Sequence, residues 1–107
     1  MKILILEDDK IRQAYFIKHL EGHEIYIVDN SKDCIEQLQK HWNYLFLDHD
    51  LGNDTDSGYV VAQWLHKKNN NLPDEIIIHS LNPVGAKRMH QLLPMAKIVP
   101  FNSKLLK

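Results

Sequence analysis

Cysteine is nearly absent from this chain of 107 residues, which also has no long apolar run and almost no net charge. Cys34 is the only cysteine, so no disulfide can form within the chain, and we expect a reducing compartment, the cytoplasm. No apolar run approaches the ~20 residues that a membrane span needs. The formal net charge is only −1, so no global field draws the protein to DNA duplexes or to anionic lipid. These shortages exclude disulfide scaffolds, membrane proteins and strongly basic nucleic-acid-binding proteins.

The remaining composition is typical of a globular protein. Hydrophobic residues make up 44% of the chain and charged residues 25%, which are both ordinary fractions. A chain of this length forms one compact domain with its own core. The N-terminus enters an apolar run at once and turns acidic too early for a signal peptide. We therefore expect a single domain over residues 1–107.

Strand-like and helix-like segments alternate along the chain, and this pattern predicts a parallel sheet. Strands are expected at residues 2–7, 24–28, 44–48, 75–79 and 97–101. Helices are expected at residues 10–21, 32–41, 59–68 and 83–93, with Asp9, Ser31 and Asn82 as N-caps and Gly22 as the C′ residue of the first helix. The predicted fold is a doubly wound α/β domain with a parallel five-stranded sheet. Too few residues follow position 101 for a full closing helix.

Ionisable residues follow three of the apolar runs at the points where the expected strands end. Glu7-Asp8-Asp9 follows the first run, Asp48-His49-Asp50 the third, and His79-Ser80 the fourth. The carboxyl ends of parallel strands meet at one edge of the sheet, and ligands bind at that edge in open α/β folds. We expect the first and third strands to be neighbours, with the fourth beside the third. The sequence thus predicts one functional site at this edge.

The acidic residues at this edge predict a metal site. Asp8, Asp9 and Asp48 are expected to converge, and carboxylates that lie close together repel unless a cation joins them. Mg²⁺ is the natural choice because it prefers oxygen ligands, and Asp50 is a further candidate ligand. Mn²⁺ and Zn²⁺ fit less well, and no spacing in the chain matches a zinc site. The structural alternative is that Asp9 only caps a helix and Asp8 is solvated.

Two histidines at the strand ends are candidates for proton transfer. If the third strand continues, Asp48 and Asp50 point to one side and His49 to the other. Asp48 can ligate a metal or act as a nucleophile. His49 and His79 suit acid–base work near neutral pH, since hydrolysis of a cyclic phosphodiester needs both a base and an acid. The alternative for His49 is a packed side chain bonded to a carbonyl group.

A candidate phosphate site follows the fourth strand. Ser80, the Asn82 side chain and the free N–H groups after Pro83 form an anion site at the start of a helix. Lys87 and Arg88 lie about one turn further along and would add positive charge there. The alternative for these two basic residues is a solvated helix face, and composition favours that alternative.

The order of these motifs resembles the receiver domain of two-component response regulators. Asp48 stands where a receiver has its phospho-accepting aspartate, and Ser80 stands where a receiver has its switch hydroxyl. A receiver also has a lysine directly before a proline at the end of its fifth strand. Here Val99 precedes Pro100. This departure argues against ordinary phosphorelay switching.

A narrower family is more similar. Leu-Asp-His-Asp-Leu-Gly at residues 47–52, Ile-His-Ser-Leu-Asn-Pro-Val-Gly at 78–85 and the following Arg88-Met89 resemble the cyclic-phosphate-processing receiver-like domain family. The resemblance implies a small domain derived from receivers. It also implies activity on 2′,3′-cyclic phosphate or related phosphate ends.

Three functional hypotheses follow from the sequence. The first, which we favour, is a metal-dependent phosphoesterase, a hydrolase acting on cyclic nucleotides or on cyclic-phosphate ends of RNA. In this hypothesis His49 and His79 act as the base and the acid that transfer protons during hydrolysis. The second is a non-catalytic pseudo-receiver that binds a protein partner through the fourth helix and fifth strand. The third is a divergent receiver phosphorylated on Asp48, which Val99 disfavours.

Overall fold

The computed structural model describes residues 1–52 and 56–101, in which strands and helices alternate as predicted. The strands are β1 (Lys2–Leu6), β2 (Glu24–Val28), β3 (Tyr44–Leu47), β4 (Glu75–Ile78) and β5 (Lys97–Ile98). The helices are α1 (Lys10–His19), α2 (Ser31–Gln37), α3 (Gly58–Lys68) and α4 (Pro83–Leu92). Residues 53–55 and 102–107 lie outside the described residues. The second stretch is where the sequence predicted no full closing helix. No helix in the described part has the length and apolar character that a membrane span requires.

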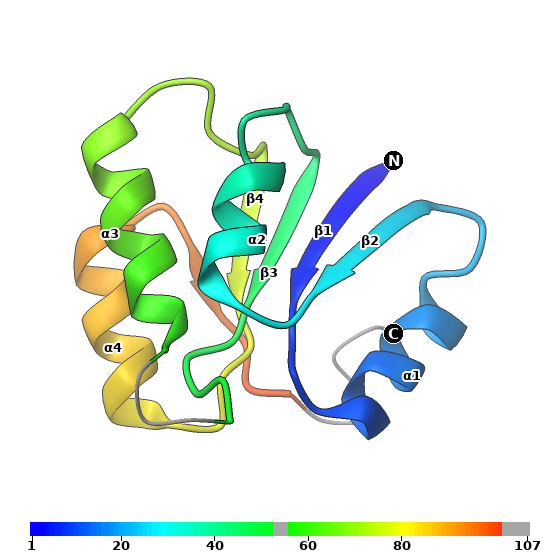
Figure 1. The fold of residues 1–107 in the computed structure, drawn as a ribbon. Helices are drawn as coiled ribbons and strands as arrows, with labels where there is room; N and C mark the ends of the chain where they lie inside the picture. Colours follow the sequence, from blue (N-terminus) through cyan, green and yellow to red (C-terminus); the bar gives the residue numbers. More distant parts are fainter. Residues whose placement is uncertain (53–55, 102–107) are drawn as a thin grey trace.

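The five strands form one parallel sheet in the order β2-β1-β3-β4-β5 (Figure 1). The predicted neighbours, β1 with β3 and β3 with β4, are confirmed. Leu47 pairs with Leu6 on one side and with Ile78 on the other, so the three central strands end level with one another. The residues that follow them therefore meet at one edge, beside the point where the strand order reverses. Ligands bind at such a point in doubly wound sheets.

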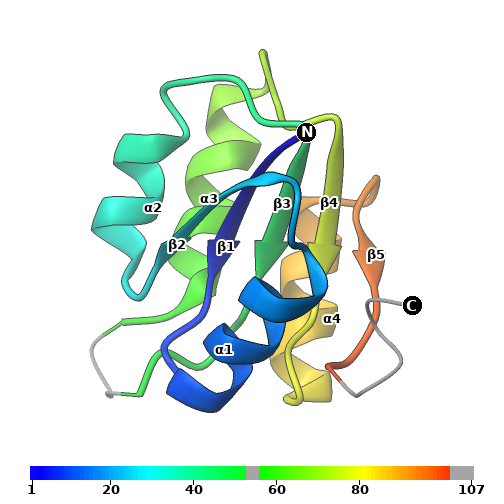
Figure 2. The same ribbon diagram turned by 90° about the vertical axis from the view of Figure 1, so that its right-hand side faces the viewer.

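Helices cover both faces of the sheet, which makes the fold doubly wound. Figures 1 and 2 show α1 on one face and α2, α3 and α4 on the other. Side chains alternate between the two faces along each strand. Leu4 and Leu6 belong to the core under α2, α3 and α4, whereas Ile3 and Ile5 pack with Phe16 of α1.

Two of the three predicted N-caps are confirmed. The Asp9 carboxylate accepts a hydrogen bond from the Arg12 N–H and begins α1. The Asn82 side chain accepts one from the Gly85 N–H and begins α4, with Pro83 in the first turn. Each cap satisfies a backbone donor that has no partner inside the helix.

The expected ends of α1 and α2 need correction. Asn30 caps α2 instead of Ser31: its backbone is extended, and its Oδ1 accepts from the Asp33 N–H at 2.8 Å. The α1 helix ends at His19, so Gly22 is not its C′ residue. Gly22 lies further along, in the turn before β2, where its φ of 94° suits glycine.

Candidate functional site

Glu7 lies at the centre of a buried polar cluster at the carboxyl edge of the sheet. Its Oε1 accepts a hydrogen bond from Arg12 Nε at 2.8 Å and lies 3.0 Å from His79 Nε2. Its Oε2 accepts from Arg12 Nη2 at 3.2 Å and from the Asp9 N–H at 3.0 Å. Burial raises the pKa of Glu7, but the hydrogen bonds from His79 and Arg12 outweigh it and lower this pKa to about 2. Glu7 is therefore an ionised carboxylate with both oxygens paired.

His79 is held beneath this carboxylate and away from solvent. Only 1% of the residue is exposed, and its ring packs edge-on against Phe16 at 5.3 Å. Burial lowers the pKa of His79, so the neutral ring donates its Nε2–H to Glu7. Its Nδ1 has no hydrogen-bond partner among the described residues. This burial argues against the predicted exchange of protons between His79 and a substrate.

Asp48 has a buried oxygen that accepts no hydrogen bond from the described residues. Its Oδ1 accepts from the His49 N–H at 2.8 Å, whereas its buried Oδ2 has no hydrogen bond within residues 1–52 and 56–101. Burial and then the charge of Glu7 raise the pKa of Asp48 to about 7. Glu7, Asp48 and His79 each place one potential metal-ligand atom within 4.8 Å of the others. Asp48 is thus poised to take up either a proton or a cation.

Arg12 supplies the positive charge of the cluster. Its Nη2 lies 3.6 Å from Asp48 Oδ2, and its guanidinium pairs with Glu7. It reaches the sheet edge from the first turn of α1, where its own N–H is bound by the cap residue Asp9. A cation from α1 therefore stands beside Asp48 in a domain in which Val99 and Pro100 follow β5.

Glu7 and His79, not Asp8 or Asp9, are the residues grouped with Asp48 as potential metal ligands among the described residues, and a shared metal site of Asp8, Asp9 and Asp48 stays a prediction. The negative charge of Asp8 contributes to the raised pKa of Asp48, after burial and the charge of Glu7. Burial also raises the pKa of Asp8 itself. The Asp8 carboxylate lies against Gly52, where a Cβ atom would overlap it and where φ is 75°. Asp9 accepts the Arg12 N–H with its Oδ2 and so caps α1, which is the structural alternative considered for this residue.

His49 and Asp50 form a second polar pair beside α4. Asp50 Oδ1 lies 2.8 Å from His49 Nδ1, and Asn82 Nδ2 donates to the same oxygen at 3.4 Å. The hydrogen bond from His49 lowers the pKa of Asp50. The alternation expected for a continuing strand does not apply, because β3 ends at Leu47 and the chain bends at His49. Asp50 therefore has partners different from those of Asp48.

A glycine on α4 makes room for the His49 ring. A Cβ atom at Gly85 would lie 2.5 Å from His49 Cδ2 and Cγ. The Gly58 N–H donates to the His49 carbonyl at 2.8 Å, which ties the chain at the base of the ring to the start of α3. The side chain of His49 is 16% exposed and that of Asp50 is 68% exposed. With Nδ1 held by Asp50, Nε2 is the nitrogen left to exchange protons.

The four predicted phosphate-binding residues lie partly in the turn before α4 and partly on its surface. Ser80 is buried, and its Oγ accepts from the Asn82 N–H at 3.0 Å, so both residues shape the turn into α4. Lys87 is exposed on α4. The Arg88 guanidinium lies 4.6 Å from the centre of the Tyr59 ring on α3. The structure thus gives Arg88 an aromatic partner, and phosphate binding by these four residues stays a prediction.

Glu7 and Arg12 are members of the site that sequence reasoning did not select. Glu7 had a usable signal: it follows Ile5 by two positions, as His79 follows Ile77, and Ile5 and Ile77 belong to the core on the α1 face. A period of two therefore directs both polar side chains to the same face of the sheet. Arg12 had only its position in the first turn after Asp9, and its contact depends on how α1 packs.

The fold is that of the receiver domains of response regulators. The phosphorylated cyanobacterial phytochrome response regulator RcpA is 18% identical with a TM-score of 0.79, over 97% of this chain and 82% of that one. The BeF3-activated DrrB receiver domain is 17% identical with a TM-score of 0.74, over 98% and 89%. TrrA of Thermotoga maritima, solved in complex with Mg²⁺–BeF, is 21% identical with a TM-score of 0.74, over 94% and 86%. At these identities the likeness shows the fold alone.

The sequence itself defines the family more narrowly. The model of the family described as cyclic-phosphate processing receiver domain matches residues 2–94. The chain therefore belongs to that family, as its motifs predicted. No curated protein matches the sequence.

Proposed function

We propose that this domain hydrolyses cyclic phosphodiesters, either 2′,3′-cyclic nucleotides or the cyclic-phosphate ends of RNA. One observation carries the proposal. The consecutive residues Asp48 and His49 bring to the same edge of the sheet a buried carboxylate oxygen that accepts no hydrogen bond from the described residues and an imidazole ring that is held through its Nδ1 by Asp50. The name of the family, cyclic-phosphate processing, supports this substrate class.

His49 is the residue that we assign to proton transfer. Its Nδ1–H donates to Asp50, an arrangement that orients the ring and leaves Nε2 as the proton acceptor. Nε2 removes a proton from a water molecule as the water oxygen attacks phosphorus. The bond from phosphorus to one ribose oxygen breaks, and that oxygen takes a proton from solvent to leave a phosphate monoester. His79 is a positioning residue in this account, since its hydrogen bond fixes the Glu7 carboxylate.

The carboxylates fit a hard divalent cation. Asp48 offers a buried oxygen that accepts no hydrogen bond from the described residues, and the charge of Asp8 acts on this carboxylate. Glu7 is a poorer ligand because Arg12, His79 and the Asp9 N–H already engage its oxygens. Asp8 and Asp48 would hold Mg²⁺, which would supply positive charge against the phosphoryl oxygens. The solved receivers TrrA and Rcp1 are described with Mg²⁺ and Mn²⁺ respectively, which supports a divalent cation here.

The start of α4 is our candidate for the other side of the phosphate. Ser80 keeps its hydroxyl hydrogen for donation, because its oxygen is the acceptor in the bond with Asn82. The first turn of α4 adds the positive end of the helix dipole. Lys87 and Arg88 are less well placed in this proposal, since Arg88 stacks on Tyr59.

A substrate panel tests the proposal. Purified protein is incubated with 2′,3′-cyclic nucleotides, 3′,5′-cyclic nucleotides and an RNA with a 2′,3′-cyclic phosphate end, each with Mg²⁺ and with EDTA. We expect the 2′,3′-cyclic phosphates to open to monoesters in the presence of Mg²⁺. Asp48→Asn should abolish the reaction, and circular dichroism should show that it folds. The absence of turnover by folded wild-type protein with Mg²⁺ or Mn²⁺ would refute the proposal.

A divergent phospho-accepting receiver is the second candidate. Arg12 favours it, because this residue restores a cation 3.6 Å from the Asp48 carboxylate even though Val99 occupies the position of the lysine. Acetyl phosphate separates the two functions. A gain of one phosphoryl group that Asp48→Asn prevents, in a protein without hydrolytic activity, would establish the second candidate in place of the first.

A further inference from the structure

An apolar groove opens beside Ser80, on the face of the sheet that α4 covers. Its volume is about 290 Å³. The lining residues are Ser80, Leu81, Pro83, Ala86, Ile98 and Pro100. Leu81 is 60% exposed and Ile98 is 42% exposed, so the groove has apolar walls on the surface of the domain. Exposed apolar patches of this kind commonly mark binding sites.

We propose that this groove binds the nucleoside part of the substrate, with the base against Leu81 and Ile98. The inference rests on the proposed function, because it takes the phosphate to lie at the start of α4. Ser80 and Pro83 belong to both regions: they line the groove and form the turn that leads into α4. A ligand that carries a flat apolar group close to a phosphate can therefore occupy the groove and the helix start together.

The size and chemistry of the groove suit a base. Small-molecule sites have volumes of about 300–1,000 Å³, and this groove lies at the lower end of that range. Proteins stack bases between aromatic or apolar side chains, and Leu81 and Ile98 offer such surfaces. Among the described lining residues, only Ser80 has a polar side chain. We therefore expect the groove to accept a base and to discriminate little between bases.

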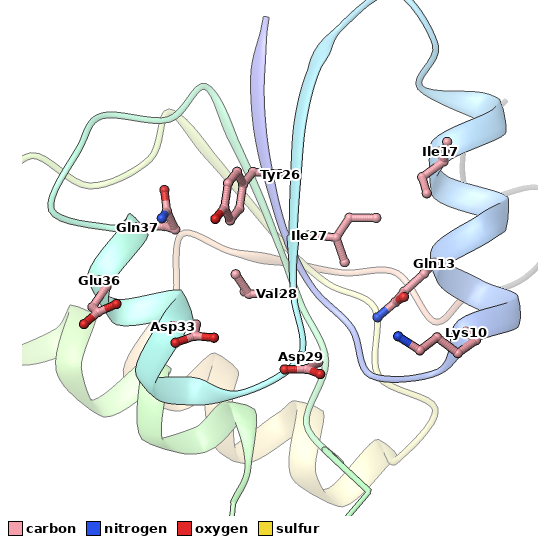
Figure 3. A pocket seen from close by; sticks show the side chains of 10 residues that line it. All are labelled: Lys10, Gln13, Ile17, Tyr26, Ile27, Val28, Asp29, Asp33, Glu36 and Gln37. Carbon is pink, nitrogen blue, oxygen red and sulfur yellow. The ribbon is translucent and has the colours of Figure 1, made fainter.

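Charge distinguishes this groove from a larger hollow on the domain. The larger hollow has a volume of about 440 Å³ and lies beside β2, between α1 and α2 (Figure 3). Three carboxylates, from Asp29, Asp33 and Glu36, line it against one lysine, Lys10. Such a lining repels the phosphate of a nucleotide. Among the described residues, the groove beside Ser80 has no acidic lining residue, so its lining does not repel an anionic nucleotide.

Binding of reaction products tests the groove without requiring turnover. The dissociation constants of adenosine 3′-monophosphate, uridine 3′-monophosphate and ribose 5-phosphate are measured by calorimetry with Mg²⁺ present. We expect both nucleotides to bind at least about tenfold more tightly than the sugar phosphate, which has no base. The double variant Leu81→Ser/Ile98→Ser should lose this ratio and keep its affinity for ribose 5-phosphate. The matched control Val60→Ser, an exposed valine on α3, should behave as wild type.

Each outcome decides the proposal. Equal affinities of wild-type protein for the nucleotides and ribose 5-phosphate would overturn it and leave the apolar walls to a protein partner. A ratio that survives in the double variant would also overturn it, because the base would then bind elsewhere. A base-dependent ratio that the double variant removes would support the groove. If that result accompanied an absence of hydrolysis, the domain would be a nucleotide-binding module, and the catalytic proposal alone would fail.

Discussion

Arg12 and Glu7 form a paired contact that joins α1 to the end of β1. Arg12 Nε lies 2.8 Å from Glu7 Oε1, and Arg12 Nη2 lies 3.2 Å from Glu7 Oε2. The same guanidinium stands 3.6 Å from the buried carboxylate of Asp48. Arg12 therefore places one positive charge beside both carboxylates. Since Glu7 also binds His79, one arginine supports the whole buried cluster.

Replacing Arg12 by Gln should destabilise the fold. The change removes two charge-assisted hydrogen bonds from Glu7 and leaves a buried carboxylate with fewer partners. We expect the free energy of unfolding to fall by about 1–3 kcal/mol, measured by urea denaturation at pH 7.5. Arg12→Lys should recover part of the loss, because lysine keeps the charge but not the fork. Lys18→Gln, an exposed change on the same helix, is the control. Equal stability of Arg12→Gln and the control would contradict the account.

Replacing Asp48 by Asn should stabilise the metal-free domain at alkaline pH. Its pKa is raised from 3.8 to about 7 in the folded state, so folding favours the protonated form. Stability from this group is therefore present below pH 4 and is lost as the pH rises through 7. The variant has no charge to bury, so its free energy of unfolding should exceed that of the wild type by about 1–3 kcal/mol at pH 8. The difference should shrink below pH 5.

Glu7 supplies the opposite control for this pH series. Its pKa is lowered from 4.5 to about 2, so its contribution is present above pH 4.5 and is lost as the pH falls towards 2. Glu7→Gln should therefore be less stable than the wild type at neutral pH, with a deficit that narrows in acid. Identical pH profiles of the Asp48 and Glu7 variants would show that the two carboxylates do not have the assigned environments.

Mg²⁺ should stabilise the wild type more at pH 8 than at pH 6. Asp48 has to lose its proton to ligate the cation, and its pKa of about 7 lies between these two values. Differential scanning fluorimetry measures Tm without Mg²⁺ and at a series of Mg²⁺ concentrations that rise about tenfold. The shift in Tm grows with the ratio of the free metal concentration to the dissociation constant. Asp48→Asn should show no shift. A shift that is independent of pH, or that persists in this variant, would place the cation elsewhere.

Replacing Gly85 by Ala should impair turnover more than stability. In an ordinary helix this change stabilises by up to about 1 kcal/mol. Here the new Cβ would lie 2.5 Å from the His49 ring, so the ring has to move away from α4. We expect kcat for a 2′,3′-cyclic nucleotide to fall by about tenfold or more, since misplaced groups lose much of their effect. In a His49→Ala background the same change should instead stabilise the helix and leave kcat unaffected. A fully active Gly85→Ala variant would remove the role that we give to this contact.

The sequence predicted the scaffold well because its signals are local. The apolar runs ending at Leu6, Leu47 and Ile78 mark buried strands, and the alternation of strands with helices requires a parallel sheet. The caps Asp9 and Asn82 follow from residue type and position. Asn30 and Ser31 illustrate the limit of such signals, because both side chains are good caps and only the backbone decides between them.

The site was harder to predict because its contacts depend on packing and on turns. Strand alternation is valid only while the strand lasts, and β3 ends at Leu47, so it could not place Asp50. The contact between His49 and Gly85 requires the position of α4 relative to β3, which no local pattern encodes. Arg12 reaches Glu7 because α1 packs over the end of β1. These are tertiary relationships between residues far apart in sequence or separated by a turn.

The central claim is that His49 transfers the proton in the opening of a cyclic phosphate, and ³¹P NMR tests it directly. The spectrum of a 2′,3′-cyclic nucleotide is followed with Mg²⁺ and wild-type protein, His49→Ala or the matched control His90→Ala. The account predicts conversion of the cyclic signal to a monoester signal by wild type and control, and a loss of at least about 100-fold in rate with His49→Ala. Equal rates for His49→Ala and wild type would contradict it.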